Sequence, residues 1–142
     1  MSVVIFDIDG TIADCTHRLH YLKDKDWDSF YRACSADTPI ISTISLLRVL
    51  SKDHQIVLST GRPERIRTLT EKWLLVHLVP YEKLLMRKDK DWRASAEIKK
   101  TNLFKLGAEA ILCAFDDKDE DVEMYNSMGV TCFKAPNPMW ES

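Results

Sequence analysis

VVIFDIDGTI, residues 3–12, is the stretch that decides the fold of this chain. Its first four residues are apolar and mostly β-branched, which is typical of a strand buried on both faces. Asp7 and Asp9 follow two positions apart, a spacing at which a strand aims both side chains to one side. Gly10 is where such a strand would break. Two acids at the tip of a buried strand repel each other unless a cation lies between them. The stretch therefore predicts a divalent metal site with a carboxylate left for chemistry.

Outward from this stretch, short apolar runs alternate with longer segments of helical periodicity. This alternation predicts an α/β fold with a parallel sheet, whose strands are joined by right-handed crossovers. A chain of 142 residues is expected to form one domain, 1–142. We predict strands at 3–9, 55–60, 83–87, 110–116 and 131–134, and helices at 40–52, 63–79, 95–106 and 120–128, the last two ended by Gly107 and Gly129.

The composition is that of an ordinary soluble globular protein, with 45% apolar and 30% charged residues. The formal net charge of −2 indicates no particular partner. The four cysteines are widely spaced without a C-x-x-C pair, which favours a reducing compartment. Cys113 and Cys132 lie in apolar runs and are predicted to be buried thiols. We recognise no signal peptide and no run long enough to span a membrane, so we expect a cytoplasmic location.

The segment 13–38 is too long to be a simple connection between the first strand and its helix. It is rich in aromatic residues, and Asp26 suits the N-cap of a helix over 27–34. Ligands of open parallel sheets bind at the carboxyl ends of the strands, so this insertion is expected beside the site. It is either a lid or substrate-recognition flap, or a small core that covers the edge of the sheet.

Polar residues follow the predicted strands at several strand ends. The carboxyl ends of parallel strands lie along one edge of the sheet, so we expect these side chains to converge. They supply acids for a metal, a hydroxyl and cations for an anion, and a nucleophile, which are the groups that phosphoryl transfer requires. The residues are Asp7 and Asp9, the run Ser59-Thr60-Gly61-Arg62, the pair Lys99-Lys100 and the pair Asp116-Asp117.

Basic residues gather after the second and third predicted strands. Cations concentrated there in a chain of net negative charge favour a polyanionic substrate, although part of them could form a solvated helix face. Three nearby aromatic residues could stack on a nucleobase or belong to the core. The acidic run 119–123 is interpreted as the solvated start of a helix. The basic residues are Arg62, Arg65, Arg67, Arg87, Lys88, Lys90 and Arg93, and the aromatic ones are Trp27, Tyr31 and Trp92.

Two other metal patterns fit poorly. An EF-hand calcium loop needs a third oxygen ligand before its glycine and a glutamate at the twelfth position, where Arg18 stands. The fragment that joins Cys15, His17 and His20 lacks a fourth zinc ligand at a usual spacing. For this segment we favour contact of His17 or Arg18 with the substrate from the flap, with surface packing as the alternative.

In this order, the motifs Asp-Ile-Asp-Gly-Thr, Ser-Thr-Gly-Arg, lysine and Asp-Asp resemble those of the haloacid dehalogenase (HAD) superfamily of phosphatases, over nearly the whole chain. Within it, the chain most resembles the phosphatase domain of phage-type polynucleotide kinase–phosphatase. VLSTGRP (57–63), FDDKDEDVEMY (115–125) and MGVTCF (128–133) carry this likeness. The resemblance implies a Rossmann-like three-layer sandwich with five parallel strands in the order 3-2-1-4-5 and a minimal cap.

The resemblance also implies roles for the acidic residues. Asp7 would be the nucleophile that forms an aspartyl-phosphate. Asp9 would protonate the leaving oxygen and then act as general base toward water. Mg²⁺ would be held by the Asp7 carboxylate, the backbone carbonyl of Asp9 and Asp116. Asp117 would orient the lysine or a water on the metal.

Further residues are implied for the substrate phosphate. Thr60, with Ser59 as second choice, would hold phosphate oxygens with its hydroxyl and the N–H groups that follow. Lys99 would neutralise the phosphate and shield Asp7 from it, with Lys100 as a competitor for this role. The remaining substrate-binding residues implied are Gly61 and Arg62, which would grip the phosphate bidentately. Arg18 is a further candidate because of its place in the flap, not because of the resemblance.

The implied function is that of a Mg²⁺-dependent phosphomonoesterase acting on nucleotides or on the 3′-phosphate end of a nucleic acid. The alternatives are a deoxynucleoside 5′-monophosphatase and a non-catalytic phosphate-binding module. No G-x-x-x-x-G-K-[ST] loop occurs in the sequence, so we expect any kinase in a repair role to be a separate partner. No membrane partner is expected, and the sequence favours no oligomeric state.

Overall fold

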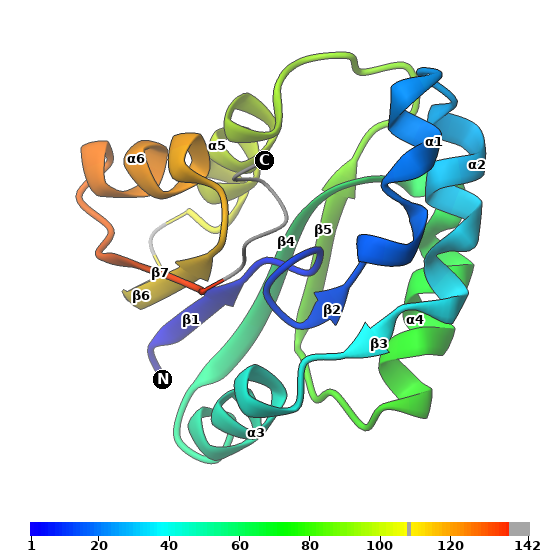
Figure 1. Ribbon diagram of the computed structural model, residues 1–142. Coiled ribbons are helices and arrows are strands. Elements are labelled where there is room, and N and C mark those ends of the chain that lie inside the picture. Colours follow the sequence, from blue (N-terminus) through cyan, green and yellow to red (C-terminus); the bar gives the residue numbers. More distant parts are fainter. Residues whose placement is uncertain (108, 137–142) are drawn as a thin grey trace.

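The computed structural model describes residues 1–107 and 109–136. Its centre is a parallel sheet in the order β5-β4-β1-β6-β7 (Figure 1). Counted along the chain, this is the predicted order 3-2-1-4-5. The strands of this sheet are β1 (Val3–Phe6), β4 (Gln55–Pro63), β5 (Lys83–Arg87), β6 (Ile111–Asp116) and β7 (Cys132–Lys134).

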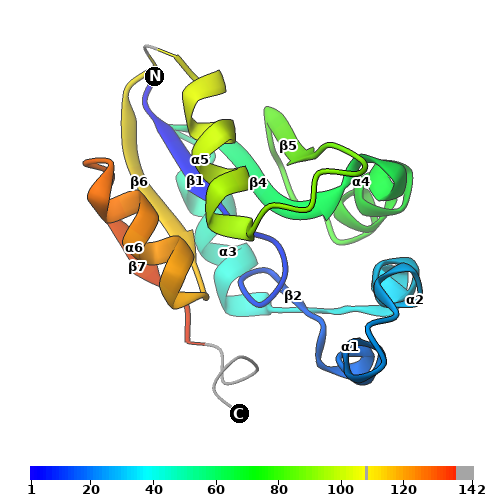
Figure 2. The ribbon, with the colours of Figure 1, turned by 90° about the horizontal axis from the view of Figure 1, so that it is seen from above.

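Helices cover both faces of the sheet and complete three layers (Figures 1 and 2). β1 contributes to both cores, because Val4 and Phe6 pack toward one helix layer and Val3 and Ile5 toward the other. This double burial confirms the interpretation of the apolar run at 3–6. The first layer contains α3 (Ile41–Leu50) and α4 (Arg67–Val76), and the second contains α5 (Ser95–Lys105) and α6 (Asp119–Ser127).

β1 ends three residues earlier than predicted, and the chain turns at once. The backbone N–H groups of residues 11–13 all donate to the carbonyl oxygen of Ile8, at 3.1, 2.9 and 3.0 Å. Gly10 has a φ of 83°, a conformation that costs glycine little. Asp7 and Asp9 therefore lie on a turn, and the strand alternation that predicted a shared direction does not apply to them.

The segment 13–38 folds over the carboxyl ends of the strands as a flap (Figure 2). Its two ends are joined by an antiparallel pair, β2 (Ala13–Asp14) with β3 (Thr38–Pro39). Asp26 caps the second flap helix as predicted, since its carboxylate accepts the N–H of Ser29 at 3.1 Å. Between the strands lie the 3-10 helices Thr16–Arg18 and Ala33–Ala36, and the helices α1 (His20–Lys23) and α2 (Trp27–Arg32).

β4 extends beyond its predicted end at residue 60. Pro63 still pairs with Arg87 of β5 and is extended, with φ −77° and ψ 154°. Pro63 therefore ends the strand and does not open the helix, which starts after the 3-10 turn Glu64–Ile66. Gly107 and Gly129 follow their helices with φ values of 63° and 80°, as predicted for helix stops.

All four cysteines are buried thiols outside any disulfide, including Cys113 and Cys132 as predicted. In the part of the chain that the structure describes, no helix has the length and apolar character needed to cross a bilayer.

Candidate active site

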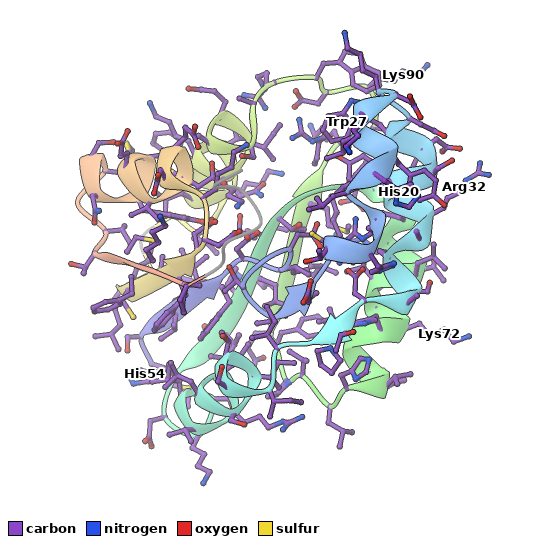
Figure 3. All side chains as sticks on the ribbon, in the orientation of Figure 1. His20, Trp27, Arg32, His54, Lys72 and Lys90 are labelled. Atoms are coloured by element: carbon purple, nitrogen blue, oxygen red, sulfur yellow. The ribbon has the colours of Figure 1, made fainter. Side chains whose placement is uncertain are left out.

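A pocket of about 450 Å³ lies at the carboxyl ends of β1 and β4. Its lining includes residues of the flap and of the 88–94 loop, which leads into α5. Figure 3 labels Trp27 on the flap and Lys90 on this loop. The four predicted catalytic residues all line the pocket, namely Asp7, Asp9, Thr60 and Lys99.

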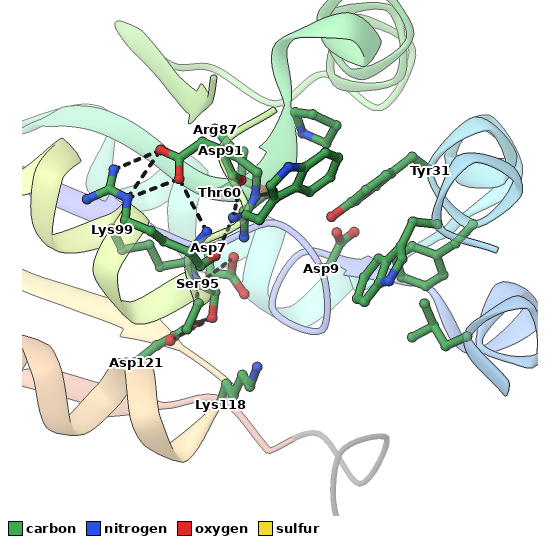
Figure 4. A pocket seen from close by; sticks show the side chains of 18 of the residues that line it. Asp7, Asp9, Tyr31, Thr60, Arg87, Asp91, Ser95, Lys99, Lys118 and Asp121 are labelled. Carbon is green, nitrogen blue, oxygen red and sulfur yellow. Dashed lines mark hydrogen bonds and ion pairs between the residues drawn. The ribbon is translucent and has the colours of Figure 1, made fainter. Parts of the chain in front are cut away.

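Lys99 lies at the centre of a buried cluster of carboxylates on one side of the pocket (Figure 4). Its Nζ is 3.1 Å from Asp7 Oδ1, 2.6 Å from Asp116 Oδ2 and 2.7 Å from Asp121 Oδ2. Asp121 is fixed in turn by the Ser95 hydroxyl, which donates to its Oδ1 at 2.9 Å. The start of α5 thus supplies both the lysine and the serine that hold α6 against the site.

Three of the acids predicted for the metal site meet beside this lysine. Asp7, Asp116 and Asp117 are buried, and each offers an oxygen within 4.8 Å of the others. The turn after β6 fixes one of them, because Asp116 Oδ1 accepts the backbone N–H of Asp117 at 2.8 Å and that of Lys118 at 3.3 Å. Carboxylate oxygens in such a group are the ligands that Mg²⁺ prefers.

Negative charge exceeds positive charge in this cluster. Burial raises the pKa of Asp7 well above its ordinary value, and the neighbouring Asp117 raises it further although Lys99 opposes both. Burial and Asp7 together raise the pKa of Asp116 to about 8. Burial alone would lower the pKa of Lys99, but Asp116 and the other carboxylates raise it, so the lysine stays charged. A divalent cation would relieve this excess, and the residues fit one.

Asp9 points away from the acidic cluster into a second charged group. Its Oδ1 accepts from Nη2 of Arg18 and Nη2 of Arg62, both at 2.7 Å. Asp37 Oδ2 accepts from the same two nitrogen atoms, at 2.7 and 3.1 Å. The two arginines and Asp37 are buried. Two acids and two guanidinium groups therefore balance each other inside the base of the flap.

This group gives Asp9 a setting opposite to that of Asp7. Burial raises the pKa of Asp9, but Arg62 and Arg18 outweigh it and bring the pKa down to about 2. Asp9 is therefore a carboxylate at neutral pH, whereas Asp7, two residues earlier, has a raised pKa. Environments that separate the pKa values of two nearby acids give the two groups different chemical roles.

Only part of the run Ser59-Thr60-Gly61 lines the pocket. Thr60 and Gly61 line the pocket, and Thr60 Oγ1 accepts the backbone N–H of Arg62 at 3.1 Å. Ser59 lies on the opposite face of β4, as strand alternation requires. Its hydroxyl is buried and accepts from Asn102 Nδ2 at 3.0 Å. The structure thus brings Thr60 to the pocket and holds Ser59 in the core.

Three other residues that were predicted to contact the substrate lie behind the pocket wall or beside it. The guanidinium groups of Arg18 and Arg62 are bound by carboxylates, and neither residue is among those described as lining the pocket. Lys100 is partly exposed and also lies outside that lining, whereas Lys99 faces the acids. We therefore propose Lys99 as the phosphate-binding lysine, and Arg18 and Arg62 as residues that position Asp9.

Two acids of the site, Asp121 and Asp37, were not predicted from the sequence. The interpretation of the run 119–123 as a solvated helix start is wrong for Asp121, which is 1% exposed. Its spacing of four from Asp117, one helical turn, is the signal that could have found it. Asp37 is buried between two arginines at the end of the flap, and no local pattern in the sequence marks it.

Replacing Asp121 with asparagine tests its hold on Lys99. We expect Asp121→Asn to lower kcat about 10- to 100-fold, because a charged hydrogen bond within the buried cluster is worth about 1.5–3 kcal/mol. Steady-state kinetics with a simple phosphomonoester would measure this, and Glu120→Gln, an exposed neighbour on α6, is the matched control. Equal rates for the two variants would contradict a role of Asp121 beyond the helix surface.

This protein is a phosphatase of the HAD superfamily. The features that define this class are the sheet order, the acids after β1, the lysine on α5 and the Asp-Asp pair after β6. Residues 1–138 match the family model described as the polynucleotide kinase PNKP phosphatase domain. The chain belongs to this family. The resemblance drawn from the motifs is thereby confirmed.

Solved structures agree with this assignment. The chain is similar to a chain of the Pnkp1/Rnl/Hen1 RNA repair complex, with 25% identity and a TM-score of 0.81, covering 94% of this chain and 42% of that one. It therefore spans less than half of that chain's length. A HAD-like hydrolase from Streptococcus pneumoniae shares the fold at 13% identity and a TM-score of 0.68, with 94% and 84% covered. A HAD family enzyme from Bacteroides thetaiotaomicron, in complex with magnesium and inorganic phosphate, shares it at 12% identity and a TM-score of 0.58, with 96% and 95% covered.

Proposed function

We propose that this phosphatase is a Mg²⁺-dependent phosphomonoesterase that works through an aspartyl-phosphate and removes the 3′-phosphate from nucleic-acid ends. The observation that carries the mechanism is the contrast between Asp7 and Asp9. Both line one pocket, but Asp7 lies against Lys99 and two acids, whereas Asp9 lies between two arginines. One carboxyl group is thus set beside a cation-binding cluster, and the other is set apart from it to handle protons.

In the proposed first step, an oxygen of Asp7 attacks phosphorus. A bond forms between Asp7 and phosphorus, the bond to the leaving oxygen breaks, and Asp9 gives that oxygen its proton. In the second step Asp9 takes a proton from water, the water oxygen attacks phosphorus, and the Asp7–phosphorus bond breaks. Lys99 lies 3.1 Å from Asp7 and offsets the charge that the phosphate brings.

The protonation state of Asp9 changes over this cycle. In the structure its pKa of about 2 leaves it as a carboxylate, ready for the second step. A phosphate dianion that enters the pocket is a like charge and raises the pKa of Asp9 toward the range in which it carries a proton. The two arginines keep the carboxyl group in one orientation through both steps.

Asp7, Asp116 and Asp117 would hold the Mg²⁺ ion. When bound, the ion supplies Lewis-acid stabilisation of phosphate charge and screens the acids from the substrate. Asp117 lies beside Asp7, with carboxylate oxygens within 4.8 Å, and raises the pKa of Asp7. The buried position of all three acids limits the access of bulk water to their oxygens.

The rim of the pocket supports a nucleic-acid substrate. Several cationic side chains line it beside the catalytic acids, and such a rim favours the phosphates of a polyanion. The similar chain in an RNA repair complex is consistent with this proposal. Because the sequence contains no ATP-binding loop, we propose that any kinase step is performed by a different domain or a partner chain. Besides Lys99, the cationic residues that line the pocket are Arg65, Arg87, Lys90, Arg93 and Lys118.

A second candidate is a deoxynucleoside 5′-monophosphatase, which keeps the same chemistry. The flap favours it, because Leu22, Trp27 and Phe30 line one side of the pocket and could enclose a single nucleotide. Comparison of kcat/KM on a 3′-phosphorylated oligonucleotide and on deoxynucleoside 5′-monophosphates separates the two. A preference of at least tenfold for the oligonucleotide is expected, and a preference for the mononucleotides would assign the second function.

Metal dependence has a readout that does not require turnover. We expect Mg²⁺ to raise the Tm of the metal-free protein, because the ion relieves repulsion among buried acids, and EDTA to abolish both this rise and the activity. Asp116→Asn is expected to lose most of the rise, whereas Glu123→Gln on the exposed face of α6 retains it. A Tm that is insensitive to Mg²⁺ in the wild type would rule out the proposed site.

A further inference from the structure

Two tryptophans line the pocket and yet remain exposed. Trp27 on α2 is 48% exposed, and Trp92 on the 88–94 loop is 79% exposed. They belong to two different segments, the flap and the loop before α5. A tryptophan so open to solvent contributes little to a core, so the interpretation of Trp92 as a core residue does not hold. Two large aromatic side chains that face one cavity need an explanation in terms of a ligand.

The loop that carries Trp92 is fixed by Arg87 at the end of β5. The Nε of Arg87 donates to the carbonyl oxygen of Gly61 at 2.8 Å, and its Nη1 donates to the carbonyl oxygens of Asp91, at 2.9 Å, and Arg93. Arg93 binds the Asp91 carboxylate with two nitrogen atoms, at 2.8 and 3.0 Å. One arginine thus ties this loop to the backbone beside Thr60, so Trp92 has a defined place relative to the catalytic residues.

The aromatic side chains of the flap are also held in fixed positions by their contacts. The rings of Trp27, Phe30 and Tyr31 lie with centroids 5.4 to 5.8 Å apart. Arg18, which holds Asp9, stacks on Phe30 at 4.4 Å from the ring centroid. Figure 4 shows Tyr31 extending across the pocket toward Asp9. Arg18 therefore connects the aromatic side chains of the flap to the catalytic residue Asp9.

Arg65 spans the two walls at the rim. Its guanidinium lies 5.4 Å from the centroid of Tyr31 and 3.9 Å from Asp28, both on α2. On the other side its backbone N–H donates to Asp89 of the loop at 3.0 Å. Arg65 thus links the flap to the loop, and both of these segments contribute a tryptophan to the lining of the pocket.

We propose that Trp27 and Trp92 form a stacking slot for the nucleobase of the nucleotide whose phosphate is removed. The proposal rests on the proposed function, because the same pocket holds Asp7. A nucleobase has two π-faces, and aromatic side chains stack on them with little regard to sequence. The cavity of about 450 Å³ lies in the range of small-ligand pockets. The slot makes the enzyme selective for a phosphate that is attached to a base-bearing sugar.

The test compares three phosphomonoesters with the same reacting group. They are a 3′-phosphorylated trithymidylate, the same oligomer with an abasic 3′-terminal sugar, and glycerol 2-phosphate, each assayed at saturating Mg²⁺. We expect Trp92→Ala and Trp27→Ala each to lower kcat/KM on the trithymidylate about 5- to 150-fold, the effect typical of removing one stacking aromatic. On the two substrates without a terminal base both variants should match the wild type, and Trp92→Phe should recover most of the loss.

Phe104→Ala is the matched control, because Phe104 is 65% exposed on α5 and outside the described pocket lining. Unchanged kcat/KM of both tryptophan variants on the trithymidylate, or equal losses on all three substrates, would overturn the slot while the phosphatase assignment stands. Absence of hydrolysis of every substrate by the wild type would instead overturn the proposed function. In that case binding of the fluorescently labelled trithymidylate to the wild type and to Trp92→Ala, measured by anisotropy, still decides the slot. Adding 3′-thymidine monophosphate as a fourth substrate shows whether one nucleotide suffices.

Discussion

Asp7→Asn is expected to lower kcat by about 10⁴-fold or more, which is the order of loss seen when a covalent nucleophile is removed. The amide has no free carboxylate oxygen with which to attack phosphorus, and the turn after β1 brings no second acid to the same place. Asp9, the nearest candidate by sequence, is held by two arginines on the other side. Steady-state hydrolysis of a 3′-phosphorylated oligonucleotide would measure the loss.

The same substitution should leave the fold intact. Burial already raises the pKa of Asp7, which means that its charged form is unfavourable there, so a neutral isostere removes a strained charge. Thermal unfolding of Asp7→Asn at a Tm equal to or above that of the metal-free wild type would confirm this. Residual activity within tenfold of the wild type, in a folded variant, would show that another group attacks phosphorus.

Asp9→Asn separates the two steps. With p-nitrophenyl phosphate, whose leaving group needs little help from an acid, the first step should proceed and the second should be slow. We expect a burst of one equivalent of nitrophenol followed by slow turnover, because only the base for water is missing. A variant that shows neither burst nor turnover, although it still binds Mg²⁺, would argue that Asp9 is needed to form the intermediate as well.

The sheet and the acidic cluster follow from local sequence, and the second charged group does not. Hydrophobic runs fix the strands, and the rule that parallel strands end at one edge brings Asp7, Asp116 and Lys99 together. The direction of Asp9 depends on a turn that begins at the end of β1, which periodicity cannot resolve to one residue. Its partners Arg18 and Asp37 come from a flap whose short helices have no hydrophobic repeat of their own.

Arg62 belongs to a motif that the sequence identifies, but its partners in the structure are two acids and not the phosphate that the motif suggests. The Ser-Thr-Gly-Arg run follows a strand at the site, so a cation there reads naturally as a phosphate ligand. In the structure β4 continues through Arg62 to Pro63, and the guanidinium of Arg62 donates to Asp9 and Asp37. These two acids lie 53 and 25 residues earlier in the chain, and only the fold brings them to Arg62. Local sequence patterns cannot predict buried ion pairs between residues so far apart in the chain.

Arg62→Met should therefore impair both stability and the acid–base step. Removing the arginine leaves Asp9 and Asp37 with one shared cation, Arg18, inside the protein. Breaking a buried ion pair from one side costs about 3–5 kcal/mol, because the remaining charge is uncompensated. We expect a loss of this order in the free energy of unfolding in urea at neutral pH. Arg32→Met, which removes an exposed arginine paired with Asp28, should cost no more than about 1 kcal/mol.

The activity of Arg62→Met should fall about 10²- to 10⁴-fold, the contribution typical of a positioned acid–base group. Arg62→Lys should rescue little of it, because a lysine offers one compact charge, whereas Arg62 donates to Asp9 and Asp37 from Nη2 and to Thr70 from Nη1. A lysine variant with wild-type kcat would show that charge alone suffices and that the orientation of Asp9 is set by other contacts.

The stability difference between the wild type and Arg62→Met should depend on pH, because it involves the charge of Asp9. In the folded protein the pKa of Asp9 is about 2, below its ordinary value of 3.8. The stability that its pairing provides is therefore complete above pH ~4 and is lost as the pH falls toward ~2. Arg62→Met lacks part of this pairing, so the gap in unfolding free energy between wild type and variant should narrow between pH ~5 and ~2. A gap that stays constant or widens on acidification would mean that Arg62 stabilises the fold by packing and not through the charge of Asp9.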